Sequence, residues 1–144
     1  MIKQRLWALF ALFSLIGLLA CSKHYFHANS VEYEGVTVQP MEIWTGGSKL
    51  WVRAMVTNSG TQPILVNRDA IVARLPSGMV VGRATGKTSV HDVYFIPAGM
   101  SHPVYIEFRE AGFDWDSVGE ASIDFSAGVT RDGQHVPLHM SVVP

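Results

Sequence analysis

The 144-residue sequence predicts an all-β fold, an antiparallel β-sandwich of about seven to nine short strands over residues 31–144. The first observation is that apolar and polar residues alternate in several short segments, as in strands with one buried face. The second is that 13 Gly and 7 Pro residues punctuate these segments, at spacings of about 8–12 residues that are typical of all-β domains. The third is that no segment after residue 22 keeps the 3.6-residue apolar period of a helix, so almost no helix is expected.

The first half of this domain is predicted to be a series of strands joined by turns. Residues 36–39 alternate between valine and polar side chains, and the Thr-Gly-Gly-Ser segment at 45–48 predicts a turn. Residues 50–57 alternate without interruption, which predicts a half-buried strand with Leu50, Val52, Ala54 and Val56 on one face. Asn-Ser-Gly at 58–60 signals a loop before another short strand that begins at 64–66.

The second half continues the pattern with one interruption. Residues 70–75 and 79–84 flank Pro-Ser-Gly at 76–78 and predict a hairpin. Residues 90–96 are rich in β-branched and aromatic side chains, and residues 104–109 alternate again. Residues 111–119 break the alternation, and we expect a single helical turn there, capped by Asp116 or Ser117.

The C-terminal hairpin is the best-determined element of the prediction, because Asp132-Gly133 is a strong two-residue turn signal. Counting outward from this turn gives a set of opposed residues that are apolar beyond the first pair: Arg131 with Gln134, Val129 with Val136, Ala127 with Leu138, Phe125 with Met140, and Ile123 with Val142. The alternate set is polar: Thr130 with His135, Ser126 with His139, and Asp124 with Ser141. One face is therefore expected to be buried and the other solvated. Pro137 cannot donate a ladder hydrogen bond, which places this strand at an edge or directs the missing donor to solvent.

The start of the chain has the features of a secretory signal. Lys3 and Arg5 precede an apolar run at 6–20, which ends in Leu18-Leu19-Ala20-Cys21. The run of about 15 residues is shorter than the roughly 18 expected of a membrane span. A buried core helix or an uncleaved anchor is the alternative interpretation.

The Leu18-Leu19-Ala20-Cys21 ending resembles the lipobox of bacterial lipoproteins. The resemblance implies that residues 1–20 form a signal-peptide helix that is removed, and that Cys21 becomes the acylated first residue of the mature chain. Residues 21–30 are then expected to be a tether to the domain at 31–144, and Ser22 implies the outer rather than the inner membrane. Cys21 is the one cysteine of the sequence, so no intramolecular disulfide can form.

The turn segments Asn58-Ser59-Gly60 and Ile96-Pro97-Ala98-Gly99 resemble those of small immunoglobulin-like domains in bacterial envelope lipoproteins. The resemblance implies an immunoglobulin-like sandwich, and it brings no binding or catalytic residue with it.

The net charge of the chain without its leader is expected to be mildly acidic. Lys3 and Arg5 leave with the leader, so nine basic and twelve acidic residues remain, a formal charge of −3. A mildly acidic chain without a basic stripe argues against nucleic-acid binding.

The sequence offers few motifs for chemistry, and we expect neither an enzyme nor a bound cofactor. Residues 82–88 resemble a phosphate-binding loop, but Val81 stands where that loop needs glycine, and a strand rather than a helix follows. No nucleotide partner is therefore expected. The chain has no Gly-x-Ser-x-Gly or His-Glu-x-x-His motif, and acylation would consume its one thiol.

Three functions remain open at this point. The first is a membrane-anchored, non-catalytic module that binds another envelope protein through a sheet edge or end loops. The second is a periplasmic copper-binding protein that uses the soft ligand Met100 together with His102. The third is a glycan or peptidoglycan binder with Trp44 and Trp115 in loops, where the alternative is that each indole fills one end of the sandwich. His24 and His27 are expected to be solvated residues of the tether.

Overall fold

The computed structural model describes residues 23–84 and 92–144, and over these ranges the chain is all-β with antiparallel pairing throughout. The predicted leader at 1–20, Cys21 and Ser22 lie outside the described residues, as do residues 85–91, which include most of the 82–88 segment. Between the described strands the helical structure consists of two single 3-10 turns, η1 (Arg68–Ala70) and η2 (Trp115–Ser117). The second of these is the helical turn predicted within 111–119.

The strands form three sheets. The first contains β1 (His24–Tyr25), β4 (Val36–Gly46), β5 (Lys49–Asn58) and β10 (Ser101–Arg109) in that order, with β3 (Val31–Tyr33) also paired to β4. The second has the order β2 (His27–Ala28), β14 (His139–Val143), β11 (Ala121–Asp124), β7 (Val72–Arg74) and β8 (Val80–Val81). The third has the order β13 (Gln134–His135), β12 (Val129–Arg131), β6 (Ile64–Asn67) and β9 (Val93–Ile96).

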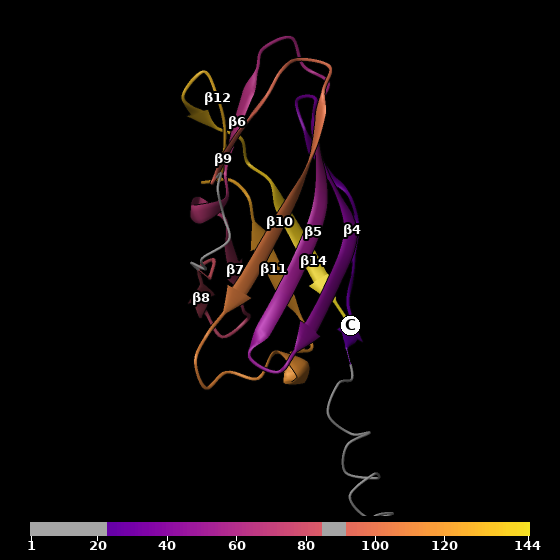
Figure 1. The fold of residues 1–144 in the computed structure, drawn as a ribbon, viewed down its shortest axis with the longest axis vertical. Coiled ribbons are helices and arrows are strands. Elements are labelled where there is room, and N and C mark those ends of the chain that lie inside the picture. The colour runs from indigo at the N-terminus through magenta and orange to yellow at the C-terminus, as the bar shows by residue number, and fades with distance from the viewer. Residues whose placement is uncertain (1–22, 85–91) are drawn as a thin grey trace, which may run out of the picture.

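One apolar core joins the three sheets. In Figure 1 the long strands β4, β5 and β10 lie across β7, β11 and β14, while β6, β9 and β12 lie toward the upper end of the molecule. The predicted inner face of β5 is confirmed, because Leu50, Val52, Ala54 and Val56 are at most 2% exposed. In β10 their partners Phe108, Ile106 and Val104 are equally buried. The turn at the lower end, between β4 and β5, and the β7–β8 hairpin are also where the sequence predicts them.

The C-terminal hairpin follows the predicted register only near its turn. Thr130 pairs with His135 and Arg131 with Gln134, as predicted, but Ile123 pairs with Met140 rather than Val142. The two registers differ because residues 125–128 form a tight turn of their own, in which Phe125 accepts backbone hydrogen bonds from Gly128 and Val129. Because the register shifts by two residues, which is one full period of side-chain alternation, the predicted inner side chains of β11 and β14 still face the core. The exception is Ala127, which was predicted to face the core and is exposed.

The segment expected to be a tether, 21–30, is paired over most of its described length. His24 and Tyr25 pair with Thr45 and Trp44 of β4, whereas His27 and Ala28 pair with Val143 and Val142 of β14. The chain thus crosses from the first sheet to the second, and the crossing residue Phe26 is 7% exposed and donates its backbone N–H to the Ile43 carbonyl at 2.9 Å. Nothing in the sequence signalled this pairing, because two-residue strands that pair through backbone groups are too short to show an alternation of apolar and polar residues.

Candidate functional site

The outer face of the first sheet carries a group of aromatic side chains near the β4–β5 turn. The sheet register places Tyr25 beside Trp44 and Trp44 opposite Trp51. The two indole rings are stacked, with centroids 5.5 Å apart and planes at 18°. Side chains on neighbouring strands stand roughly perpendicular to the sheet, so the stacked pair projects outward as a unit. Trp44 was expected in a loop, but it lies within β4, because this strand continues through Gly46 before the chain turns.

Cations lie against these rings. The ammonium group of Lys23 is 4.4 Å from the Trp44 ring centroid, and that of Lys49 is 5.9 Å from the Trp51 centroid. Further along the same face the Arg53 guanidinium lies 5.4 Å from the Tyr105 ring. Such cation–π contacts stabilise both partners while leaving the charge accessible to water or to an anion. We call this surface the aromatic–basic face: Lys23, Tyr25, Trp44, Lys49, Trp51, Arg53, Tyr105 and Arg109.

Two carboxylates share the aromatic–basic face with its four cations. Glu107 lies 3.8 Å from Lys49 and 2.6 Å from Arg109, and Glu42 is opposite Arg53 in the register. The face is therefore a mixed surface with an excess of positive charge, although residues 21–144 carry twelve acidic and nine basic side chains.

The β4–β5 turn beside this face is held by η2. The Asp116 carboxylate accepts hydrogen bonds from the Thr45 hydroxyl at 2.6 Å and from the Gly47 backbone N–H at 3.0 Å. The Thr45 hydrogen bond and the Gly47 hydrogen bond, with the nearby His24, lower the pKa of Asp116 against the raising effect of burial. The cap of η2 is Asp114, which accepts from the Asp116 N–H at 3.1 Å, rather than the Asp116 or Ser117 that the sequence predicted.

Trp115 fills the lower end of the core. Its side chain is 0% exposed, its backbone N–H donates to the Gly47 carbonyl at 2.8 Å, and its ring meets Phe113 edge-on at 5.1 Å. The expectation that Trp115 could stack on a sugar from a loop is wrong, because no face of the ring reaches solvent. The alternative, an indole that closes one end of the fold, is confirmed.

Met100 and His102 have different surroundings. Met100 is 55% exposed in the turn before β10, whereas the His102 ring lies 4.3 Å from the Tyr94 ring. The His102 Nδ1 is also 2.8 Å from the Pro103 carbonyl oxygen. Over 23–84 and 92–144, no group of three or more His, Cys, Asp or Glu side chains is arranged to share a metal ion. Within the same ranges no helix is long and apolar enough to cross a membrane.

The structure brings Asp124 close to Ser126 and His139, the two residues that the predicted register had already placed opposite each other. The Ser126 hydroxyl is 3.2 Å from His139 Nε2, and His139 Nδ1 is 3.4 Å from the Asp124 carboxylate. Burial would raise the pKa of Asp124, but hydrogen bonds from Ser126 and Arg74, together with the nearby His139, hold it below its ordinary value. The arrangement resembles a hydrolase triad in connectivity. Its hydrogen bonds serve the 125–128 turn, since Ser126 Oγ accepts the Leu138 N–H at 3.2 Å and Asp124 accepts the Ser126 N–H at 3.0 Å.

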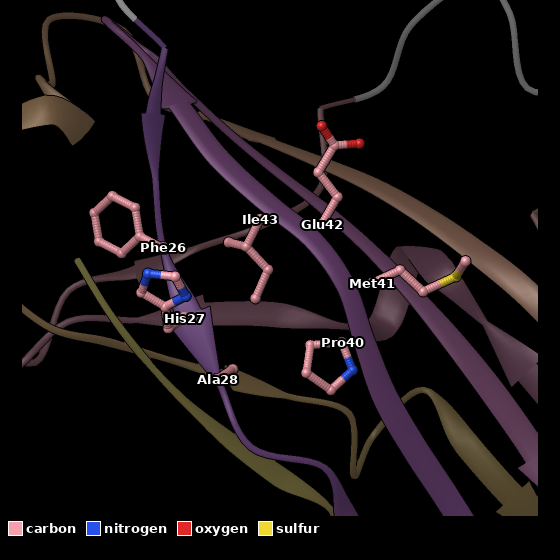
Figure 2. Close-up of a pocket in the computed structure, with 7 residues that line it drawn as sticks. All are labelled: Phe26, His27, Ala28, Pro40, Met41, Glu42 and Ile43. Carbon is pink, nitrogen blue, oxygen red and sulfur yellow. The ribbon is translucent and has the colours of Figure 1, made fainter.

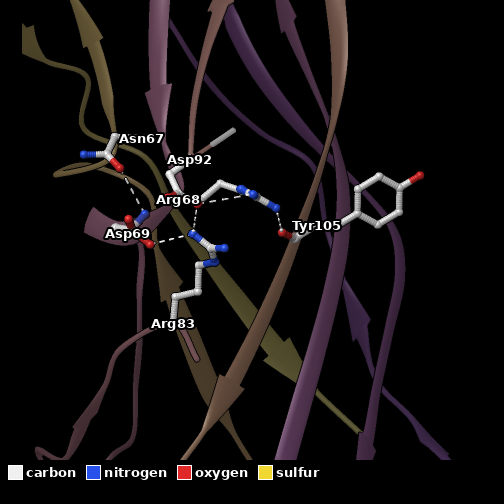
Figure 3. A network of polar contacts seen from close by, with 6 residues as sticks. All are labelled: Asn67, Arg68, Asp69, Arg83, Asp92 and Tyr105. Atoms are coloured by element: carbon white, nitrogen blue, oxygen red, sulfur yellow. Dashed lines mark hydrogen bonds and ion pairs between the residues drawn. The ribbon is translucent and has the colours of Figure 1, made fainter. Parts of the chain in front are cut away.

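A second polar network joins the chain on both sides of residues 85–91. Arg83 binds Asp92 at 2.6 Å and also pairs with Asp69, and these carboxylates raise its pKa although burial would lower it. Arg68 lies 3.5 Å from Asp92, donates to the Tyr105 carbonyl at 3.0 Å, and stacks over the Tyr94 ring. Figure 3 shows the Arg83 guanidinium beside Asp69 and Asp92, and the Arg68 guanidinium extended between Asp92 and the Tyr105 carbonyl. The network fixes η1 against β10, which is a structural role.

A small hollow lies where the crossing segment passes β4. Figure 2 shows Phe26, His27 and Ala28 on one side and residues 40–43 on the other, with Met41 pointing away from Phe26. The hollow arises at the bulge between Pro40 and Glu42, where the β4–β5 register shifts. Its volume of about 120 Å³ is well below the roughly 300 Å³ at which small-molecule sites begin.

The strand pair β6–β9 presents an apolar outer face. Leu65 pairs directly with Phe95, and these side chains are 45% and 62% exposed. Val93 lies two residues from Phe95 on the same side of β9 and is 51% exposed. Among the described strands β9 ends its sheet, with β6 as its one partner. We call Leu65, Val93 and Phe95 the β6–β9 face. The sequence predicted short strands here but not which of their side chains are exposed. That depends on which side of these strands the other sheets cover.

Comparison with known proteins shows a fold and no family. No protein-family model and no curated protein matches the sequence. The yjhA protein from Bacillus subtilis is similar in structure, with a TM-score of 0.52 and 9% identity over 68% of this chain and 77% of that chain. The structural-genomics target SoR45 aligns over 88% of this chain and 85% of that chain at 12% identity, with a TM-score of 0.38. At such identities the first likeness is one of fold alone, and the second is too weak to add to it.

Proposed function

We propose that this chain is a lipid-anchored, non-catalytic module of the bacterial cell envelope that binds another envelope protein through the β6–β9 face. The anchor is the acylated Cys21, and Ser22 beside it favours the outer membrane. The observation that carries the binding role is the exposed Leu65–Phe95 pair, on a strand that ends its sheet. Large apolar side chains grouped in this way are typical of protein–protein contact sites.

The position of the β6–β9 face fits this role. The described chain begins beside the β4–β5 turn at the lower end of the molecule, and β6 and β9 lie toward the upper end (Figure 1). The ten-residue strand β5 connects the two levels and spans about 33 Å at roughly 3.3 Å per residue. An anchor at the lower end therefore leaves β6 and β9 at the opposite end of the molecule, where a partner can reach them.

The fold we propose in detail is an immunoglobulin-like sandwich. Its support is the N-terminal segment, which pairs with β4 of the first sheet through β1 and with β14 of the second through β2. A segment that pairs with an edge of each sheet ties the two layers of a sandwich together. The non-catalytic role is supported by the Asp124, Ser126 and His139 contacts, since their hydrogen bonds are used to build the 125–128 turn.

A photo-crosslinking amino acid at position 95, introduced in living cells, tests the binding role. We expect one dominant crosslinked protein, because Phe95 is 62% exposed and central to the β6–β9 face. The matched control is position 80, where Val80 is 47% exposed on β8. Adding Leu65→Asp should weaken the crosslink at 95, since a charge beside Phe95 opposes burial of the pair. Equal crosslinks at 95 and 80, or a crosslink that Leu65→Asp leaves unchanged, would contradict the proposal.

A further inference from the structure

We propose that the aromatic–basic face rests on the headgroups of an anionic lipid surface, so that the domain is held at the membrane in one orientation. This inference rests on the proposed lipid anchor at Cys21. It goes beyond that proposal by assigning a lipid-binding surface to the folded domain itself.

The proposed anchor is close to the aromatic–basic face along the chain. Two residues of backbone reach at most about 7 Å, so the acylated residue lies within that distance of the Lys23 Cα. The Lys23 ammonium is 4.4 Å from the Trp44 ring, and His24 and Tyr25 are already paired with β4. The paired segment thus begins at His24, three positions after the proposed anchor. Acyl chains that enter a bilayer at Cys21 bring this face to its surface.

The side chains of the aromatic–basic face are of the types found at membrane–water interfaces. Tryptophan and tyrosine are enriched at membrane–water interfaces, because their rings are apolar and their N–H or O–H groups are polar. The stacked Trp44–Trp51 pair and the neighbouring Tyr25, which is 54% exposed, supply this composition. Lysine and arginine beside a membrane are attracted to anionic headgroups. Lys23, Lys49, Arg53 and Arg109 outnumber Glu42 and Glu107 on the face, although the mature chain is acidic.

The arrangement of the rings favours a lipid surface over a sugar as the occupant of this face. A sugar ring stacks on an open aromatic face. Here Trp44 and Trp51 stack on each other, and each ring also has a lysine ammonium over it. What projects from the sheet is a compact aromatic unit surrounded by cations, which suits insertion among phosphate headgroups.

The test uses the intrinsic tryptophans of the mature, lipidated protein in phospholipid vesicles. Trp7 leaves with the leader, so the emission comes from Trp44, Trp51 and Trp115, and Trp115 is fully buried. Lipids with brominated acyl chains quench tryptophans at the bilayer interface. With phosphatidylglycerol present we expect loss of roughly half of the emission, and in a Trp44→Phe/Trp51→Phe variant we expect almost none. In neutral phosphatidylcholine alone, or with Lys23→Glu and Lys49→Glu together, the quenching should fall severalfold.

Vesicle flotation in the same samples distinguishes the two proposals. Protein that floats and shows the expected quenching supports the inference. Protein that floats while its tryptophans are not quenched overturns the inference and leaves the anchor intact. Protein that does not float overturns the anchor, and the inference falls with it. A change in Trp44 and Trp51 emission on adding soluble peptidoglycan fragments, without quenching in vesicles, would replace the lipid surface by a glycan.

Discussion

Replacing Trp115 with alanine should lower the free energy of unfolding by about 3–5 kcal/mol, the range found for large buried aromatics. The indole is 0% exposed, and it closes the core at the end where η2 meets the β4–β5 turn. Its removal leaves a cavity that the surrounding strands cannot fill, because they are fixed by their own ladders. Equilibrium urea unfolding of the mature protein, followed by circular dichroism, measures the loss.

Trp115→Phe is the matched control for this prediction. Since the Trp115 indole nitrogen is buried without a hydrogen-bond partner, phenylalanine loses no hydrogen bond and keeps much of the packing. We therefore expect a clearly smaller loss than for alanine. Equal losses for the two variants, or a loss below about 1 kcal/mol for alanine, would mean that the ring is not packed in the core.

The second large effect is expected for Gly128→Ala. A Cβ at this position would clash with Ile71 Cγ1 and lie 2.7 Å from the Asn67 carbonyl oxygen. The Gly128 carbonyl also accepts the Asn67 N–H at 2.6 Å, so the two backbones cannot separate without losing this bond. We expect a destabilisation of about 3 kcal/mol, at the upper end of overpacking costs. Urea unfolding measures it.

Gly119→Ala provides the comparison. An added Cβ at Gly119 meets no atom within 4 Å, and this glycine is not among those with positive φ. Its replacement should change stability by no more than about 0.5 kcal/mol. If Gly128→Ala were equally neutral, the 125–128 turn could not lie as close to Asn67 and Ile71 as the structure shows.

The alternation of side chains was sufficient to predict a half-buried strand such as β5 and its inner face. It did not predict the short edge strands β1 and β2, whose residues were expected to be a tether. The register of strand pairing was predicted correctly only next to a turn with a specific sequence signal. Asp132-Gly133 fixed the pairing of Thr130 with His135. Beyond Val129 the pairing is decided by Asp124 and Ser126, whose side chains bond the backbone and form a separate turn. Hydrogen bonds of this kind compete with the ladder, and no periodicity signals them.

The candidate site was visible in the sequence only in part. Trp44 was singled out, but Trp51 was not, although counting back from a two-residue turn at 47–48 places the two residues opposite each other. The role of Lys23 could not be predicted, because it depends on the pairing of His24 and Tyr25 with β4. The β6–β9 face likewise follows from the packing of the sheets, which determines the side of β9 that faces solvent.

The proposed anchored function and the proposed lipid-binding face both depend on Cys21 being the acylated first residue of the mature chain. The most direct measurement is mass spectrometry of the N-terminal peptide from protein extracted from the membranes of its own cells. If Cys21 is acylated as proposed, we expect a peptide that begins at Cys21 and carries two or three acyl chains. A peptide in which Met1–Ala20 is still joined to an unmodified Cys21 would contradict it.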